Sequence, residues 1–341
     1  MKAIILEKPG QLQYTDMEAP GTPGQGEALI RIHNVGMCGT DLHAFRGEQP
    51  FFTYPRLLGH ELSAEVVALG QDQSGTVNLA PMARCALEPY FYCGHCAPCR
   101  RGTTNCCVNL RVFGVHIDGG MREFAIVPIS QLHPSATLSF EQLALVEPLS
   151  IGAHAVRRGQ LTKGECVLVV GAGPIGLAVT QFALLAGARV LVMDISERRL
   201  EFCQRQWPEV VCINGNGDAL AALQNVVADD PPTAVFDATG NPQSMMAAFH
   251  YAAYGGRLIF VGLFPGDITF HDPHFHSHEL SLLSSRNATA EDFHHVMAAF
   301  EAGLINPTPW ITHRASPDTM IDAFPSWFDR DSGIIKAIVT F

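Results

Sequence analysis

The sequence predicts a protein of mixed α/β and β class, in which a β-barrel domain precedes a doubly wound parallel sheet. Before about residue 145, short apolar or alternating runs are separated by Gly and Pro, which is typical of a small barrel or sandwich. After about residue 150, apolar strands alternate with helical segments, as in βαβ units. A glycine-rich loop follows the first strand of this second part and opens its first helix.

The expected elements follow from these patterns. In the first part, the apolar runs predict strands at 3–6, 28–35, 63–69 and 123–127. In the second part, they predict strands at 167–170, 190–193, 210–213, 234–237 and 258–261, with helices at 177–186, 197–206 and 243–253. Thr289 with Asp292, and Ser316 with Pro317, mark two later helix starts, and residues 334–341 predict a last strand.

These elements predict a discontinuous first domain. We expect a first domain at 1–148 with a cysteine-rich lobe at about 88–110, a second domain at 149–285, and a return to the first domain at 286–341. A chain of 341 residues is long enough for about two domains of ~150 residues.

Composition excludes several classes of partner. The net charge of −11, from 33 acidic and 22 basic residues, argues against a nucleic-acid partner. Residues 166–188 carry no charge, but the glycine loop in their middle indicates a strand, a turn and a helix rather than a membrane span. The N-terminus lacks the apolar segment of a signal peptide, so we expect a cytoplasmic protein whose clustered cysteines bind metal.

Four cysteines have the spacing of a structural zinc site. They are Cys93, Cys96, Cys99 and Cys107. Four thiolates at this spacing can surround one Zn²⁺ tetrahedrally. The neighbouring Cys106 could only compete with these ligands.

A sparser set suits a second, reactive zinc. Cys38 offers a thiolate, His60 an imidazole nitrogen, and Glu61 or Glu147 a carboxylate oxygen, which leaves one position open. A zinc held in this way lowers the pKa of bound water to about 7 and should act likewise on an alcohol. Asp41 is suited to orient His60.

Thr40 and His43 suggest a route for the alcohol proton. We expect the Thr40 hydroxyl to take the proton and pass it, through the coenzyme ribose, to His43 near solvent. The alternative for His43 is an ordinary surface histidine after a turn.

The glycine loop predicts a dinucleotide site. It contains Gly171, Gly173, Pro174, Ile175 and Gly176, and its glycines allow a tight turn, close approach of a pyrophosphate and close helix packing. Asp194 lies at the end of the next strand, where a carboxylate binds the ribose hydroxyls and repels a 2′-phosphate, so we expect NAD rather than NADP. Asp194 could alternatively cap the following helix, and Arg199 could close the ribose pocket or lie on a solvated face.

Together these motifs resemble the zinc-containing medium-chain dehydrogenase/reductase family over essentially the whole chain. The resemblance rests on Cys38-Gly-Thr40-Asp41-x-His43, Gly59-His60-Glu61, the four-cysteine lobe, Glu147-Pro148 and the glycine loop. It implies a GroES-like catalytic domain, a Rossmann coenzyme domain, two zinc ions, NAD, and a homodimer or homotetramer. Glu147-Pro148 resembles the sorbitol and threonine dehydrogenase branch, in which Glu61 and Glu147 exchange at the metal or one of them holds the zinc-bound water.

The resemblance also implies contacts at the nicotinamide end. The residues concerned are Thr239, Val261, Gly262, Leu263, Ser285, Arg286 and Asn287. Segments 49–56, 114–120 and 285–293 are similar to bacterial L-galactonate dehydrogenases, which implies oxidation of a sugar-acid hydroxyl to a keto-aldonate such as tagaturonate. Arg56, His116, Arg286 and Asn287 are candidates to hold a carboxylate or hydroxyls, with scaffold or coenzyme contacts as the alternative.

Other functions are compatible with parts of the sequence. A polyol, sorbitol-type or amino-alcohol dehydrogenase is the alternative within the same family. A catalytically silent ligand sensor and a zinc-ribbon module that binds nucleic acid are the alternatives outside it. The histidine-rich segment 271–278 contains a proline and lacks a thiolate, so we expect a surface or interface loop there rather than a metal site.

Overall fold

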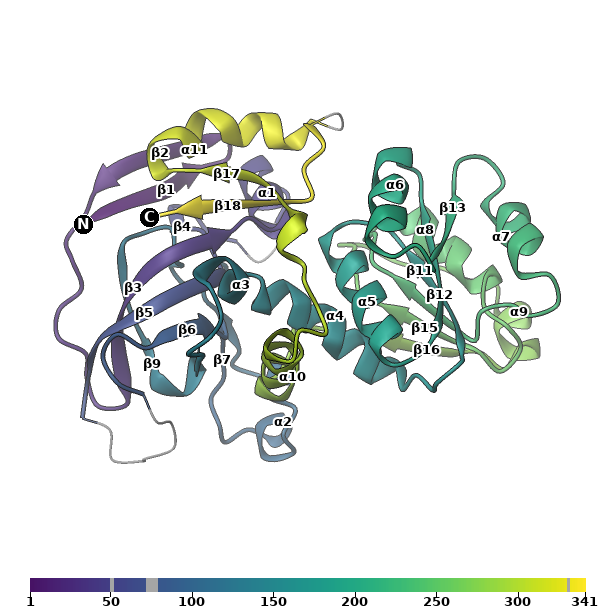
Figure 1. Ribbon diagram of the computed structural model, residues 1–341, viewed down its shortest axis with the longest axis horizontal. Helices are drawn as coiled ribbons and strands as arrows, with labels where there is room; N and C mark the ends of the chain where they lie inside the picture. Colours follow the sequence, from purple (N-terminus) through teal and green to yellow (C-terminus); the bar gives the residue numbers. More distant parts are fainter. Residues whose placement is uncertain (50–51, 72–78, 330–331) are drawn as a thin grey trace. The chain divides into compact units, whose positions relative to one another are not determined.

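The computed structural model describes residues 1–49, 52–71, 79–329 and 332–341. These residues form two compact units (Figure 1). Unit 1 contains Met1–Glu147 and Thr289–Phe341, and unit 2 contains Pro148–Ala288.

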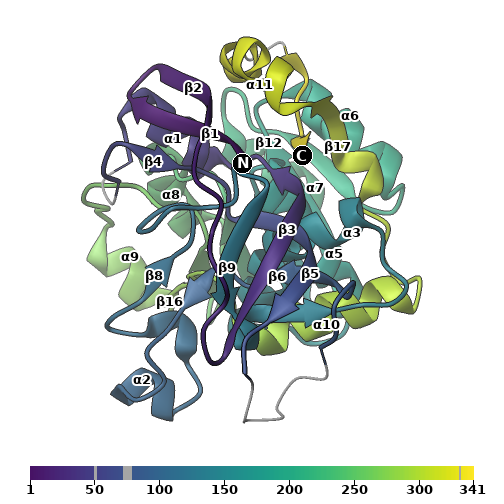
Figure 2. The ribbon, with the colours of Figure 1, turned by 90° about the vertical axis from the view of Figure 1, so that its left-hand side faces the viewer.

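Unit 1 is built on a mostly antiparallel sheet. Among the described residues, the sheet has seven strands. Six follow the order β10 (Leu132–Pro134), β6 (Arg84–Leu87), β5 (Glu61–Leu69), β3 (Glu27–Gly36), β18 (Lys336–Thr340) and β17 (Ile311–Ala315), and the seventh, β9 (Phe124–Pro128), also pairs with β3. The long central pair is β3 (Glu27–Gly36) with β5 (Glu61–Leu69). Alternate residues of β3, including Ala28, Ile30 and Ile32, are buried, because successive side chains of a strand point to opposite faces. Figure 2 shows β3, β5, β6 and β9 beside one another.

Shorter elements complete the first part of unit 1. The other strands are β1 (Lys2–Lys8), β2 (Gln11–Asp16), β4 (Arg56–Leu57), β6 (Arg84–Leu87), β7 (Tyr90–Phe91), β8 (Arg111–Val112), β9 (Phe124–Pro128) and β10 (Leu132–Pro134). The helices are α1 (Gly39–Arg46), α2 (Ala97–Arg100) and α3 (Phe140–Ala144), and α4 (Val146–Gly159) begins at the end of this part. The segment around α2 projects from the sheet as a lobe (Figure 2).

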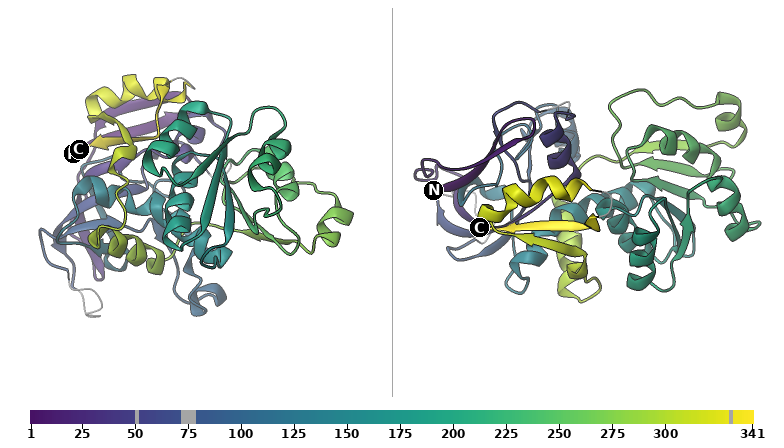
Figure 3. Two further views of the ribbon diagram at one scale, coloured as in Figure 1. Left: turned by 45° about the vertical axis from the view of Figure 1, so that its right-hand side comes forward. Right: turned by 90° about the horizontal axis from the view of Figure 1, so that it is seen from above.

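The C-terminal segment belongs to unit 1. It contains α10 (Ala290–Glu301), β17 (Ile311–Ala315), α11 (Pro317–Ala323) and β18 (Lys336–Thr340). Thr289 begins α10 with the expected capping box, in which its amide donates to Asp292 Oδ2 at 2.9 Å. The last strand, β18, pairs antiparallel with β3, so the end of the chain completes the N-terminal sheet (Figure 3).

Unit 2 is a doubly wound parallel sheet. Its strands follow the order β13-β12-β11-β14-β15-β16, and every pair is parallel. Their bounds are β11 (Cys166–Val170), β12 (Arg189–Asp194), β13 (Val211–Asn214), β14 (Ala234–Asp237), β15 (Arg257–Phe260) and β16 (Ser281–Ser284). Helices α5 (Pro174–Leu185) and α6 (Glu197–Gln206) lie on one side of the sheet, and α7 (Ala219–Val227) and α8 (Pro242–Ala247) lie on the other (Figure 1).

Two expectations for unit 2 were wrong in detail. The helix expected at 243–253 ends earlier, because α8 tightens into a 3₁₀ turn at Ala248–His250. The segment 271–278, expected as a loop, contains the short helix α9 (Asp272–Ser277), since Pro273 is favourable in a first helical turn.

The uncharged stretch that resembled a membrane span is divided between β11 and α5, as expected. Of the helices in the described part of the chain, none is both long and apolar enough to cross a membrane.

Candidate active site

The lobe around α2 brings four cysteines together. Their sulfurs lie within 4.8 Å of one another, and Cys96 Sγ is 3.3 Å from Cys99 Sγ and 3.8 Å from Cys107 Sγ. A tetrahedron with Zn–S distances of about 2.3 Å has edges of about 3.8 Å, so the geometry fits one zinc ion. Cys106 is exposed and lies outside this set.

Backbone amides favour the thiolate form at Cys93, whereas burial raises the pKa of Cys99 to about 12. The amides of Cys93 and Asn109 both donate to Cys107 Sγ at 3.3 Å. A backbone hydrogen bond from His95 is the main reason that the pKa of Cys93 falls to about 6. Because thiolates are the metal-binding form of cysteine, the lobe suits a cation.

A second candidate metal set lies where β3, α1 and β5 meet. Cys38 precedes α1, and His60 and Glu61 lie at the start of β5. One ligand atom from each of these three residues lies within 4.8 Å of the others. The register of the sheet places Glu61 opposite Gly36, where a Cβ would lie 2.1 Å from Glu61 Oε2. Glycine is therefore required at this position.

Asp41 lies behind His60, as expected from the sequence. Its Oδ2 accepts a hydrogen bond from the Cys38 amide at 2.9 Å, and its Oδ1 lies 3.7 Å from His60 Nδ1. Both Oδ1 and Nδ1 are buried without a hydrogen-bond partner. Burial lowers the pKa of His60, but the negative charges of Asp41 and Cys38 raise it well above its usual value. The same negative field would attract a metal ion, which fits the proposed site.

The two glutamates have different partners. Lys336 Nζ lies 2.7 Å from both oxygens of Glu61 and also donates to the Met37 carbonyl at 3.0 Å. Glu147 instead accepts a hydrogen bond from the Tyr90 hydroxyl. Burial is the main cause that raises the pKa of Glu147 to about 7. A cation therefore neutralises Glu61, whereas a neutral hydroxyl binds Glu147.

Sequence reasoning missed Lys336 and Tyr90. A lysine within the apolar segment 334–341 was a usable signal, because a buried lysine requires a negative partner. Tyr90 had no comparable signal. It is held by packing, since its ring lies 6.3 Å from Phe293, which stacks on His133 at 5.0 Å. His133 is in turn bonded to Glu88 at 3.0 Å.

The two residues proposed for proton transfer lie one turn apart on α1. Thr40 is partly buried and His43 is exposed. His43 Nδ1 lies 3.1 Å from Glu48 Oε2. Residues three apart lie on the same side of a helix, so Thr40 and His43 share one side of α1.

The glycine loop joins β11 to α5 in unit 2. Gly171 has a φ of +98°, and Gly173 is the N-cap of α5, with Pro174 in the first turn. A Cβ on Gly176 would lie 1.7 Å from the Gly171 carbonyl oxygen. The close packing that the sequence predicts at Gly176 is therefore present, and the α5 N-terminus is available to phosphates.

Asp194 is bonded directly to this loop. Its Oδ2 accepts from the Ala172 amide at 2.6 Å, and its Oδ1 accepts from the Ser196 amide at 2.8 Å. The residue that caps α6 is Ser196, so the alternative role of Asp194 as the N-cap was wrong. Arg199 Nη1 lies 3.6 Å from the Cβ position of Gly173, which places Arg199 over the loop.

The residues expected at the nicotinamide end follow β14, β15 and β16. Thr239 donates its hydroxyl to Asp237 at 2.7 Å, and the amides of Val261 and Gly262 donate to the Asp237 carbonyl. Leu263 is 65% exposed. These contacts order the ends of the strands, where open α/β sheets bind ligands.

Two side chains after β16 fit a polar ligand group. Ser285 Oγ and Asn287 Nδ2 are buried and have no hydrogen-bond partner among the described residues, and Asn287 has a φ of +51°. Arg286 lies between them. A buried donor without a partner is costly, so these atoms fit a ligand that offers hydrogen bonds, as a nicotinamide carboxamide does.

The two residues of unit 1 that were predicted to bind substrate, Arg56 and His116, already form hydrogen bonds within the protein. Arg56 Nη1 lies 3.3 Å from Asp118 Oδ1, and its Nη2 donates to Thr53 Oγ1 at 2.5 Å. His116 Nδ1 accepts from the Val112 amide at 3.0 Å. Pro50 and Phe51, within the segment 49–56, lie outside the described residues.

Each of the two units contains residues that match a known domain family. Residues 24–137 match the alcohol dehydrogenase GroES-like domain, and residues 174–302 match the zinc-binding dehydrogenase domain. The chain is 40% identical to L-galactonate-5-dehydrogenase of Escherichia coli K12, over 100% of this chain and 99% of that protein. The chain belongs to the zinc-containing medium-chain alcohol dehydrogenase family. The prediction of a GroES-like domain with a Rossmann domain is thereby confirmed.

Similar solved structures include one with NADH and one with NADP. The RspB alcohol dehydrogenase of Escherichia coli CFT073, complexed with NADH, has a TM-score of 0.92 and 32% identity, over 100% of this chain and 99% of that chain. A putative zinc-binding dehydrogenase of Sinorhizobium meliloti, bound to NADP, has a TM-score of 0.90 and 28% identity, over the same shares. The fold alone therefore does not decide between NAD and NADP.

We predict that Cys107→Ser removes one zinc per chain and lowers thermal stability. The thiolate set would lose one of four ligands, and structural zinc sites contribute directly to folding. Metal analysis and thermal unfolding measure both effects. Cys106→Ser is the matched control, and an equal zinc loss in that variant would contradict the assignment.

We predict that Lys336→Met lowers the free energy of unfolding by about 3–5 kcal/mol, the usual effect of removing one partner of a buried ion pair. Glu61 and Lys336 are 0% and 2% exposed, so water cannot replace the lost partner. Urea unfolding measures the change. The double variant with Glu61→Gln should recover part of the loss, and no recovery would show that the pair is not the cause.

We predict that Asp194→Ala reduces the preference for NAD over NADP, because the carboxylate that repels a 2′-phosphate is gone. The ratio of kcat/KM for the two coenzymes measures this preference. The substitution also removes the hydrogen bond to Ala172, so both coenzymes should bind more weakly. An unchanged ratio would refute the role of Asp194 in discrimination.

Proposed function

We propose that this chain oxidises a secondary hydroxyl of a sugar acid, such as L-galactonate, to a keto-aldonate such as tagaturonate, with NAD⁺ as the oxidant. The observation that supports this class of reaction is the close grouping in unit 1 of a partly buried thiol, a buried imidazole and a buried carboxylate, at Cys38, His60 and Glu61. When bound, zinc would lower the pKa of a substrate hydroxyl, and NAD⁺ would accept a hydride from its carbon.

Each residue has a stated part in this proposal. Cys38 and His60 hold the zinc, together with Glu61 or Glu147. The contact between Glu61 and Lys336 favours Glu147 as the carboxylate that is free to exchange, because an ammonium group holds Glu61 whereas Glu147 accepts a hydrogen bond from the neutral Tyr90 hydroxyl. Asp194 holds the adenosine ribose, and the unpartnered donors at Ser285 and Asn287 orient the nicotinamide.

The choice of substrate rests on similarity along the whole chain. The relative with 40% identity is described as an L-galactonate-5-dehydrogenase. A sugar acid carries a carboxylate, and Arg56 is a cation that could bind one. Its Nε is buried and has no hydrogen-bond partner in the part of the chain that the structure describes, so Arg56 retains a donor despite its contact with Asp118.

A proton must leave the substrate hydroxyl during oxidation. We propose that Thr40 receives it and that His43, exposed beside Glu48, delivers it to solvent. His43→Gln should lower turnover mainly below about pH 8, where free hydroxide is scarce and a histidine base matters most. A pH–rate profile tests this, with imidazole as an external base that should restore part of the activity. A profile identical to the wild type would contradict the relay.

We predict that zinc-loaded protein reduces NAD⁺ fastest with L-galactonate in a panel of sugar acids, polyols and amino alcohols. Absorbance of NADH measures the rate. The highest kcat/KM with sorbitol or another polyol would favour a polyol dehydrogenase and refute the substrate assignment. Binding of panel members without turnover would favour a ligand sensor and refute the enzymatic role.

A further inference from the structure

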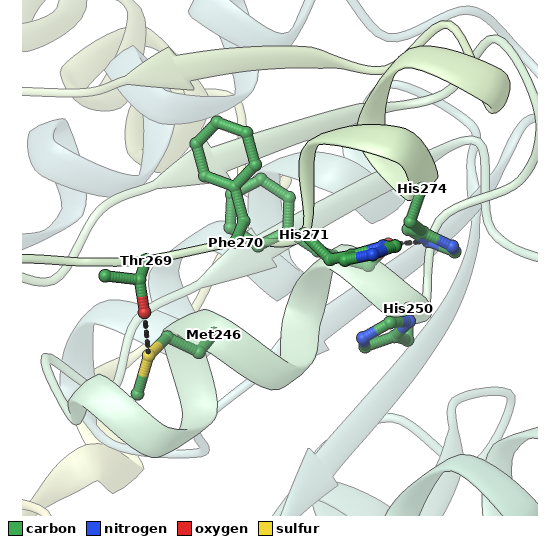
Figure 4. A pocket seen from close by; sticks show the side chains of 7 residues that line it. Met246, His250, Thr269, Phe270, His271 and His274 are labelled. Atoms are coloured by element: carbon green, nitrogen blue, oxygen red, sulfur yellow. Dashed lines mark hydrogen bonds between the residues drawn. The ribbon is translucent and has the colours of Figure 1, made fainter.

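A pocket in unit 2 is lined by histidines that the proposed reaction does not use (Figure 4). Its volume is about 390 Å³. The lining residues are Met246, Phe249, His250, Thr269, Phe270, His271 and His274. The rings of His250, His271 and His274 point toward one another in Figure 4. No carboxylate lines this pocket among the described residues.

Two segments far apart in sequence supply these rings. His250 ends the 3₁₀ turn after α8, whereas His271 and His278 are the caps of α9 and His274 lies within it. The ring centroids of His250 and His274 are 4.4 Å apart, and those of His274 and His278 are 3.9 Å apart. Spacing of four residues places His274 and His278 on one side of the helix.

Backbone contacts fix the orientation of two of the four rings. His274 Nε2 lies 3.1 Å from the Phe249 carbonyl, and His278 Nδ1 lies 3.0 Å from the His274 carbonyl. A ring nitrogen that faces a carbonyl must carry the hydrogen. The opposite nitrogens, His274 Nδ1 and His278 Nε2, therefore hold lone pairs when the rings are neutral.

The orientation of the other two rings is not fixed by hydrogen bonds with the described residues. His250 and His271 are exposed, and neither ring forms a hydrogen bond with the described residues. Burial lowers the pKa of His250, and so do its histidine neighbours His274, His278 and His271. Neutral imidazole, the form that binds metal, is thus favoured at His250.

We infer that this histidine cluster, His250, His271, His274 and His278, binds a divalent transition-metal ion of the nickel, copper and zinc group. Imidazole ligands suit these ions, whereas magnesium and calcium are usually bound by carboxylates, which are not found among the described residues that line the pocket. The ring nitrogens of the four histidines do not all lie within 4.8 Å of one another, as the ligand atoms of each of the two cysteine-containing sets do. Rotation of His250 and His271 toward the fixed His274 would complete the site.

A metal ion here would join α9 to the turn after α8. Both segments otherwise meet through Phe249, whose ring stacks on Phe270 at 4.8 Å and lies 6.1 Å from Phe275. A metal ion that binds only the folded state raises the free energy of unfolding with the logarithm of the ratio of metal concentration to Kd. The site would therefore stabilise α9 independently of the zinc ions of unit 1.

Nickel binding to the zinc-loaded protein tests this inference. Equilibrium dialysis against Ni²⁺, with metal analysis, should show one nickel per chain beyond the two zinc sites. His250→Gln and His271→Gln should each weaken binding at least about tenfold, a loss that even an outer partner of a metal ligand can cause. Both side chains are exposed, so these variants should fold normally.

His276→Gln is the matched control, because His276 is exposed on α9 but does not line the pocket. It should bind nickel like the wild type. Absence of nickel from the wild type would overturn the inference, and so would equal affinity in the wild type, His250→Gln and His271→Gln. Equal weakening in His276→Gln would also overturn it, since binding would then reflect scattered surface histidines.

Discussion

The buried ion pair between Glu61 and Lys336 is the contact on which the candidate metal site depends. Glu61 adjoins the ligand His60 and is fully buried, so its charge could not persist there without a partner. The partner comes from β18, some 275 residues further along the chain. The C-terminal strand is therefore part of the site, although every cysteine and histidine of the metal set comes from the first 60 residues.

The pair also distinguishes Glu61 from Glu147, since only Glu61 belongs to the set of ligand atoms that lie within 4.8 Å of one another among the described residues. A lysine ammonium neutralises Glu61, whereas Tyr90 gives Glu147 only a neutral hydrogen bond. A cation bound to Cys38 and His60 would add to the positive charge that Lys336 already exerts on Glu147. If Glu61 and Glu147 exchange at such a metal, moving Glu61 would cost more free energy. Glu61 would have to separate from the Lys336 ammonium group, whereas Glu147 would have to leave only the Tyr90 hydroxyl.

The features predicted from sequence are local ones. The four cysteines lie within fifteen residues and the glycine loop within six, so chain geometry alone brings their atoms together. The barrel and the parallel sheet were also predicted, because the apolar periodicity changes near residue 150. Lys336 and Tyr90 were missed because their roles arise from pairing of β18 with β3 and from packing of α10, which no short motif encodes. The capping role considered for Asp194 failed for a related reason, since its carboxylate is bonded to the glycine loop 22 residues earlier.

Anomalous diffraction at the zinc absorption edge, from crystals of the zinc-loaded protein, tests the central claim most directly. The account predicts one peak among the sulfurs of the α2 lobe and a second peak beside Cys38 and His60. The second peak should also contact one glutamate, and its position would identify Glu61 or Glu147 as the ligand. A peak in the lobe with none beside Cys38 would contradict the account, because no zinc would then be present to activate a hydroxyl.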